Sequence, residues 1–107
     1  MANVIKYSAI LKTPTNVAAT EVDRLVEQML GPEGLEIRDR KFHLTHYSKC
    51  FIGSEAVNWI VKTQKATHQE AVRLGQLLID RGIIHHVIDE HGFKDEYLFY
   101  RFYCDEM

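Results

Sequence analysis

Three segments of the chain repeat their apolar residues at the spacing of an amphipathic α-helix. The first begins at Thr20 and ends before Gly31-Pro32, a pair of residues that stops a helix. The second begins near Gly53-Ser54, where Ser54 is expected to be the N-cap. The third follows the capping box Thr67-His68-Gln69-Glu70 and ends at Gly82, which favours the left-handed conformation at a helix end. The pattern therefore predicts three helices that pack around one core.

The remaining apolar positions follow the pattern of strands rather than helices. Leu35-Glu36-Ile37-Arg38 alternates apolar and charged residues, as a half-buried strand does. The stretch from Arg40 to Phe51 mixes polar and aromatic residues without a helical period, which predicts an extended hairpin arm. Ile83 to Ile88 and Tyr97 to Tyr103 are rich in β-branched and aromatic residues and predict two paired strands. The order predicts an α+β, winged-helix-like fold: a three-helix core, a β-hairpin arm and a small C-terminal antiparallel sheet.

A chain of 107 residues is sufficient for one domain. We expect the domain to span residues 20–103, with an N-terminal extension or linker at 1–19 and a tail at 104–107. The large side chains expected in the core are Trp59, Leu74, Leu78, Ile84 and Phe99.

Composition favours a cytoplasmic protein. The shares of apolar residues (46%) and charged residues (26%) are those of an ordinary globular domain. Two cysteines do not form a disulfide framework and fit a reducing compartment. No apolar run approaches the ~20 residues that span a bilayer, and the first residues do not resemble a signal peptide.

Charge is distributed unevenly along the chain. The net formal charge is −2, but residues 38–49 carry four basic residues against one aspartate, a local +3. A basic patch on an acidic body suits a directional electrostatic contact. The candidate contact residues are Arg38, Arg40, Lys41 and Lys49, with Tyr47 as a hydrophobic contact on the same arm. The alternative is a solvated, charged hairpin that has no partner.

Several sequence motifs of the chain, taken together and in order, resemble those of one family. These stretches are Cys50 to Trp59, Arg81 to Val87, Phe93-Lys94-Asp95 and Leu98 to Phe102. Together they resemble the DEP domain, which is shared by Dishevelled, pleckstrin and regulators of G-protein signalling. Among members of this family, the DEP repeats of an inhibitor of the mTOR kinase are the most similar in these motifs. The resemblance extends from about Thr20 to Phe102.

The resemblance implies a non-catalytic module for intracellular signal transduction. In this family, a basic surface and the hairpin arm are associated with anionic phospholipid headgroups and receptor tails. That role carries over to Arg38, Arg40, Lys41 and Lys49. The implied partners are a protein, a receptor tail or an anionic membrane surface, which the module would reach from the cytoplasm as a peripheral protein. Four basic residues give only a weak, reversible membrane association, at ~1 kcal/mol each.

A winged-helix nucleic-acid-binding domain is the alternative from another class. Such a domain places a basic recognition helix in the major groove. Here the segment Thr67 to Arg81 offers Arg73 and Arg81 against Glu70 and Asp80, so it carries no net charge. Because phosphate neutralisation supplies most nonspecific affinity, the neutral charge of this segment argues against nucleic-acid binding. A self-association module is a third possibility that the sequence leaves open.

Neither a metal site nor a catalytic site is expected. His85 and His86 would point to opposite faces of a strand, and the cysteines do not have a zinc-binding spacing. The sequence contains no nucleophile elbow, no phosphate-binding glycine loop and no recognisable carboxylate pair. We therefore expect no enzyme activity and no cofactor.

Overall fold

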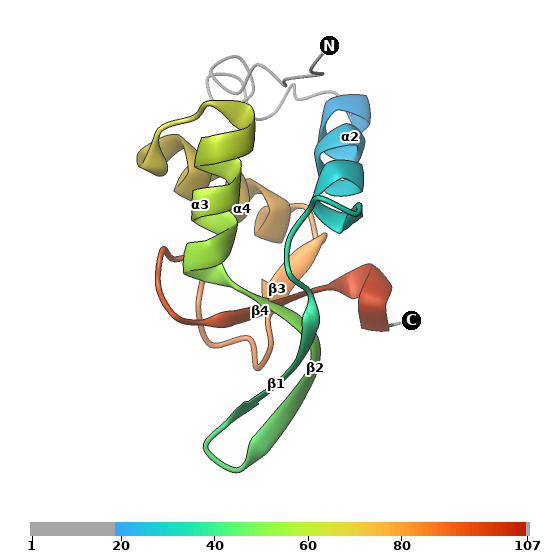
Figure 1. Ribbon diagram of the computed structural model, residues 1–107, viewed down its shortest axis with the longest axis vertical. Coiled ribbons are helices and arrows are strands. Elements are labelled where there is room, and N and C mark those ends of the chain that lie inside the picture. Colours follow the sequence, from blue (N-terminus) through green and yellow to red (C-terminus); the bar gives the residue numbers. More distant parts are fainter. Residues whose placement is uncertain (1–18, 107) are drawn as a thin grey trace.

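The computed structural model describes residues 19–106. It places three helices at one end of the molecule and a hairpin arm that projects from the other end (Figure 1). The helices are α2 (Ala19–Leu30), α3 (Gly53–Gln64) and α4 (His68–Asp80). The strands are β1 (Arg38–Phe42), β2 (Thr45–Ile52), β3 (Ile84–His86) and β4 (Phe99–Phe102), and a short 3₁₀ helix, η2 (Tyr103–Glu106), follows β4. The α+β fold with three helices and a β-hairpin arm is confirmed.

Helix α2 has the amphipathic face that the sequence predicts. Val22, Leu25 and Met29 are buried on its inner side. The helix ends at Leu30, and the backbone N–H of Leu35 then donates to the carbonyl of Met29 at 2.8 Å. This hydrogen bond satisfies one of the carbonyls that a helix end leaves free.

Helix α3 follows β2 without a connecting loop, and the prediction of Ser54 as its N-cap is wrong. The N-cap position is held by Ile52, which makes no side-chain capping bond. Instead, the N–H groups of Gly53 and Ser54 donate to the carbonyls of Leu98 and Glu96 at 2.9 and 3.0 Å. The segment before β4 thus supplies the acceptors that a helix start needs, so no side-chain cap is required.

Helix α4 begins and ends as its local sequence predicts. The Thr67 hydroxyl accepts from the N–H of Glu70 at 3.0 Å, and the Thr67 N–H donates to the Glu70 carboxylate at 2.9 Å. The capping box is therefore confirmed. Gly82 follows the helix with a φ of +69°, in the left-handed region expected for it.

The four strands form one antiparallel sheet in the order β1-β2-β4-β3. Strand β2 joins its two parts: its first half pairs with β1 to form the arm, and residues Cys50 to Ile52 pair with β4. The strand expected at Leu35–Arg38 begins only at Arg38. Leu35 and Ile37 are partly buried against the core without strand pairing, so their alternation with charged residues reflects burial alone.

The sheet has a different apolar cluster on each face. On the helix side, four side chains pack with the three helices into the main core: Phe51, Ile84, Tyr100 and Phe102. A smaller cluster, formed by Cys50, Ile52 and Phe99 with Tyr47 and Val87 against it, belongs to the opposite face, because residues along a strand alternate between faces. The face of the sheet without helices is therefore also partly apolar.

Four of the five predicted core residues are buried. Leu74, Leu78, Ile84 and Phe99 are all 5% exposed or less. Trp59 lies partly buried at the edge of the core, and its indole N–H donates to the carbonyl of Glu33 at 3.0 Å. This position matches the amphipathic character of tryptophan, whose ring packs while its N–H needs an acceptor.

Candidate docking surface

The hairpin arm is formed by β1 and β2, which reverse direction at His43 and Leu44. His43 has a φ of 57°, the left-handed conformation that a tight turn requires. The Leu44 side chain at the tip is 88% exposed, the largest value among the exposed large hydrophobic residues described. An apolar side chain that protrudes so far does not stabilise the fold, and it is available to a partner.

The arm presents different side chains on its two faces. Lys41 is paired with His46, whereas Phe42 is paired with Thr45 and belongs to the other face. Phe42 and Tyr47 line a hollow between the arm and the loop that precedes β4. The arm is therefore amphipathic, with an aromatic face toward the body and Lys41 and His46 on the opposite face.

Three of the predicted basic residues lie on the surface. Arg38, Lys41 and Lys49 are all exposed. The guanidinium of Arg38 lies 3.1 Å from the Glu36 carboxylate, but both side chains are more than 60% exposed, so this ion pair contributes little. The backbone N–H of Lys49 donates to the Asp39 carboxylate at 3.0 Å, which leaves the lysine side chain itself exposed.

Arg40 has a different environment, and its assignment to the exposed basic surface must be corrected. It is only 8% exposed. Its guanidinium donates to the carbonyls of Cys50 and Glu36 at 3.2 and 3.0 Å and lies 3.9 Å from the half-exposed Glu55 carboxylate. Arg40 therefore fixes the base of the arm to the preceding segment and is not available to a partner.

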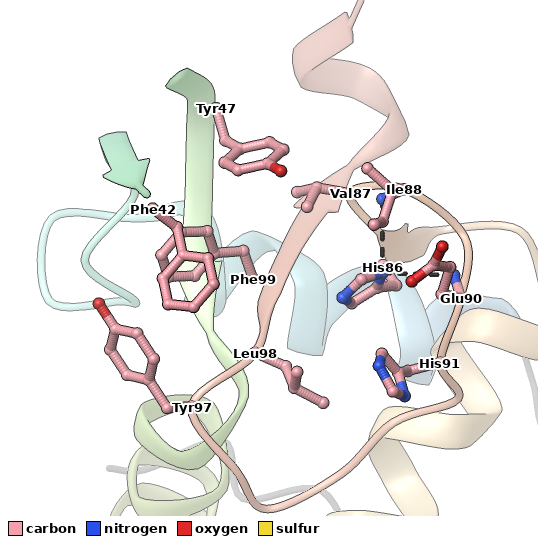
Figure 2. A pocket seen from close by; sticks show the side chains of 10 residues that line it. All are labelled: Phe42, Tyr47, His86, Val87, Ile88, Glu90, His91, Tyr97, Leu98 and Phe99. Atoms are coloured by element: carbon pink, nitrogen blue, oxygen red, sulfur yellow. Dashed lines mark hydrogen bonds between the residues drawn. The ribbon is translucent and has the colours of Figure 1, made fainter. Parts of the chain in front are cut away.

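The hollow beside the arm has a volume of about 210 Å³ (Figure 2). Ten residues line it: Phe42, Tyr47, His86, Val87, Ile88, Glu90, His91, Tyr97, Leu98 and Phe99. The ring of Phe99 is contacted edge-on by the rings of Phe42, Tyr47 and Tyr97 at centroid distances of 6.2, 5.8 and 5.4 Å. Tyr47 thus lines the hollow. Its predicted role as a hydrophobic contact with a partner agrees with this position and stays a proposal.

Sequence reasoning did not single out the other apolar residues of this surface. Phe42 and Tyr97 are 47% and 60% exposed, and Leu44 stands beyond them at the tip. The available signal was their position: all three lie outside the segments with helical periodicity that predict the core.

His86 forms an uncharged part of the hollow. Burial lowers its pKa below 6.5, and the neighbouring His91 lowers it further. Its Nδ1 accepts from the backbone N–H groups of Ile88 and Glu90 at 3.4 and 3.3 Å. These donors require a ring nitrogen without a proton, so they also favour the neutral imidazole.

His85 has the opposite electrostatic environment. Its Nδ1 and Nε2 lie 2.8 Å from the Asp89 carboxylate and 2.6 Å from the Glu106 carboxylate. Burial opposes the charged ring, but the hydrogen bonds to Asp89 and Glu106 outweigh burial and raise the pKa of His85 above 6.5. Arg101 lies 3.0 Å from Glu106 and is the main cause of that carboxyl's lowered pKa. Protonated His85 thus links η2 to the sheet and to the loop after β3.

His85 and His86 belong to opposite faces of β3, since His85 pairs with Arg101 and His86 with Tyr100. Within residues 19–106 no group of three or more His, Cys, Asp or Glu side chains is arranged to hold a metal ion. In the same part of the chain, no helix is long and apolar enough to cross a membrane.

The fold and the arm define a class of small α+β module in which three helices support a protruding hairpin. The family described as "Domain found in Dishevelled, Egl-10, and Pleckstrin (DEP)" matches residues 34–102. The chain belongs to the DEP domain family.

Curated relatives of the chain are much longer proteins. The chain is 41% identical over 97 residues to the human phosphatidylinositol 3,4,5-trisphosphate-dependent Rac exchanger 2 protein, covering 90% of this chain and 6% of that protein. It is 39% identical to Vacuolar membrane-associated protein IML1 of Eremothecium gossypii, covering 76% of this chain and 6% of the relative. The chain therefore matches only a small part of each of these proteins.

Solved DEP domain structures share the fold. The DEP domain of mouse pleckstrin2 matches with a TM-score of 0.69 and 23% identity, over 81% of this chain and 84% of that one. The DEP domain of mouse pleckstrin matches with a TM-score of 0.66 and 20% identity, over 82% and 91%. At these identities the likeness supports the fold alone.

Proposed function

We propose that this DEP domain is a non-catalytic docking module of intracellular signal transduction. It attaches the protein that carries it to a membrane surface, a receptor tail or a protein partner, and an anionic membrane surface is the partner that the arm fits best. The contact residues are Arg38, Lys41, Lys49 and Tyr47, while Arg40 holds the base of the arm. The module acts in the cytoplasm and peripherally at the inner membrane face.

The observation that carries this proposal is the composition of the exposed arm. Lys41 and Lys49 are exposed on a hairpin whose tip is the 88% exposed Leu44. A cationic surface with a protruding apolar side chain matches the boundary between anionic headgroups and acyl chains. Neither the exposed lysines nor Leu44 contributes to the hydrophobic core, whose buried residues lie elsewhere in the chain.

The names of two relatives agree with a membrane role. One is called phosphatidylinositol 3,4,5-trisphosphate-dependent, and the other is called vacuolar membrane-associated. These names describe the relatives themselves, and we extend only the general idea of an anionic membrane surface to this chain.

The expected affinity is low. Each cation near an anionic surface contributes about 1 kcal/mol, and burial of the Leu44 side chain contributes about 1.5–3 kcal/mol. The arm alone therefore gives a weak and reversible attachment, which a second contact elsewhere in a larger protein would strengthen.

Vesicle co-sedimentation tests this function. The chain should sediment with vesicles that contain acidic headgroups, and much less with zwitterionic vesicles. Binding should weaken as salt rises to physiological levels, because the contact is screened over about 8–10 Å. Equal binding to both kinds of vesicle, or none at low salt, contradicts the membrane proposal.

Matched charge reversals locate the contact. Lys41→Glu with Lys49→Glu should abolish vesicle binding, whereas Lys62→Glu with Arg73→Glu, on the exposed sides of α3 and α4, should preserve it. A parallel assay with duplex DNA tests the winged-helix alternative, which tight DNA binding would support.

A further inference from the structure

Residues 87–91, the loop that follows β3, form one wall of the hollow beside the arm. The backbone of this loop turns at Asp89, whose φ is 58° and whose N–H donates to the carbonyl of His86 at 2.9 Å. The loop belongs to no helix or strand, so contacts from side chains decide how firmly it is held. It supplies four of the ten residues that line the hollow: Val87, Ile88, Glu90 and His91.

His86 holds the loop through its neutral ring. Its Nδ1 accepts from the backbone N–H groups of Ile88 and Glu90 at 3.4 and 3.3 Å, as the dashed lines in Figure 2 show. A ring nitrogen accepts a hydrogen bond only while it carries no proton. Protonation at Nδ1 would place a donor opposite these two donors, so both hydrogen bonds would be lost.

The surroundings of His86 favour this neutral state. Burial lowers its pKa, and the electrostatic interaction with His91, whose ring stands edge-on at a centroid distance of 4.8 Å, lowers it further. The other titratable groups around the ring are Glu90 and Asp89, which raise the pKa, His85, which lowers it, and Tyr100 of β4, which contacts the ring edge-on. The hydrogen bonds to the loop are therefore present above a pKa that lies below 6.5, and they are lost as the pH falls through it.

His85 holds the same loop through its protonated ring. Its Nδ1 lies 2.8 Å from the Asp89 carboxylate and its Nε2 lies 2.6 Å from the Glu106 carboxylate. Both contacts together require a proton on each ring nitrogen, because a neutral imidazole has a single N–H. The Asp89 side chain is 69% exposed, whereas Glu106 is 31% exposed and also paired with Arg101, so Asp89 is the partner that the neutral ring releases.

The surroundings of His85 favour the protonated state. Burial opposes the charge, but the hydrogen bonds to Asp89 and Glu106 outweigh burial and raise its pKa. Arg101 of β4 is paired with Glu106 at 3.0 Å, and the Tyr103 ring stacks on the imidazole at a centroid distance of 4.2 Å. The contact with Asp89 is therefore present below a pKa that lies above 6.5, and it is lost as the pH rises through it.

We propose that His85 and His86 form a two-sided pH clamp, which fixes the loop 87–91 within a window of pH and releases it at more acidic and at more alkaline pH. The window includes pH 6.5, the ordinary value from which the two rings depart in opposite directions. Adjacent residues can act in opposite senses because they belong to opposite faces of β3. One wall of the hollow is therefore ordered only inside this window.

NMR spectra of the ¹⁵N-labelled chain between about pH 5 and 8, the range in which histidines titrate, test the proposal. The heteronuclear NOE of the Ile88 and Glu90 amides reports backbone order and should be highest near pH 6.5, falling on both sides. The amides of α4 should show no such maximum. In the imidazole ¹⁵N–¹H spectrum at pH 6.5, both nitrogens of His85 should carry protons and the Nδ1 of His86 should not.

Two variants separate the sides of the clamp. Asp89→Asn removes the carboxylate and tolerates the positive φ, so the order of the loop should rise with pH and not fall again. His86→Phe keeps an aromatic ring but removes the Nδ1 acceptor, so the loss of order at acidic pH should disappear. Asp95→Asn is the matched control, because it changes an exposed carboxylate outside the loop and should reproduce the wild-type profile.

Thermal melts establish that each variant is folded. Loop order that is independent of pH, or that changes in one direction only in the wild type, overturns the proposal, as does a wild-type profile in Asp89→Asn. If His86→Phe does not fold, the wild-type profile and the exposed Asp89→Asn variant still decide. No vesicle is present in these experiments, so their outcome is independent of the membrane function proposed above.

Discussion

Arg40 and Lys41 are neighbours of the same charge, yet they have different roles. Arg40 is buried and bonded to two backbone carbonyls, whereas the Lys41 side chain is exposed. The register between β1 and β2 shifts between Arg38 and Arg40. This irregularity cannot be inferred from the sequence alone, because it depends on how the whole hairpin pairs.

Replacing Arg40 with alanine should therefore destabilise the domain by about 2–3 kcal/mol. The change leaves the carbonyls of Cys50 and Glu36 without their charged donor. Lys41→Ala, the matched control, should change the free energy of unfolding by no more than about 0.5 kcal/mol. Denaturant unfolding measures both; equal effects would place Arg40 on the surface after all.

The second residue-scale prediction concerns His85, whose pKa is raised in the folded protein. A raised folded pKa means that the protonated ring stabilises the fold below 6.5, and this contribution is lost as pH rises through the folded value. The stability difference between the wild type and His85→Gln should thus be largest at mildly acidic pH and shrink above neutrality. His86 titrates in the opposite sense but is present in both proteins, so its effect cancels. Thermal melts across this range measure the difference, and a constant or growing difference would contradict the ion-pair network.

Local motifs were the most predictable features at the scale of the element. The capping box at Thr67 and the left-handed Gly82 were correct because each involves only residues adjacent in sequence. Ser54 was assigned wrongly because the acceptors for the start of α3 come from Leu98 and Glu96, more than forty residues away. Helix ends are predictable when their hydrogen-bond partners are local and unpredictable when those partners are distant.

Thr67→Ala should cost about 1 kcal/mol, because it removes the hydroxyl that accepts from Glu70. Thr67→Ser keeps this oxygen and should retain most of the stability. Chemical denaturation of the three proteins checks the prediction, and an alanine variant as stable as the serine variant would contradict it.

Gly75 of α4 lies against the buried ring of Phe93, which approaches the helix backbone closely at this position. Gly75→Ala normally improves a helix interior, yet here the new Cβ would overlap this ring. We expect a net loss of about 1–3 kcal/mol. Combining it with Phe93→Leu should recover part of the loss, and a stabilising Gly75→Ala would show that the ring can move away freely.

At the scale of the whole molecule, the sheet connects the core to the arm. Strand β2 pairs with β1 in the arm and with β4 beside the core, and Arg101 of β4 donates to the Ser48 carbonyl at 2.7 Å. Helical periodicity predicted the three helices, whereas the absence of that period and the β-branched and aromatic content predicted the arm and the two C-terminal strands. Charge predicted an exposed basic surface on the arm, but Arg40 is buried and does not belong to it. The single sheet and the hollow beside the arm depend on contacts between distant segments, so the sequence did not reveal them.

The central claim is that the arm is the part of the molecule that meets an anionic membrane. The most direct measurement is an amide NMR spectrum of the ¹⁵N-labelled chain, recorded while vesicles with acidic headgroups are added, with zwitterionic vesicles as the control. We predict that the signals of residues 38–49 broaden first and that the amides of α4 change little at the same lipid ratio. Broadening that begins on the helices, or an equal response to both kinds of vesicle, would contradict this claim.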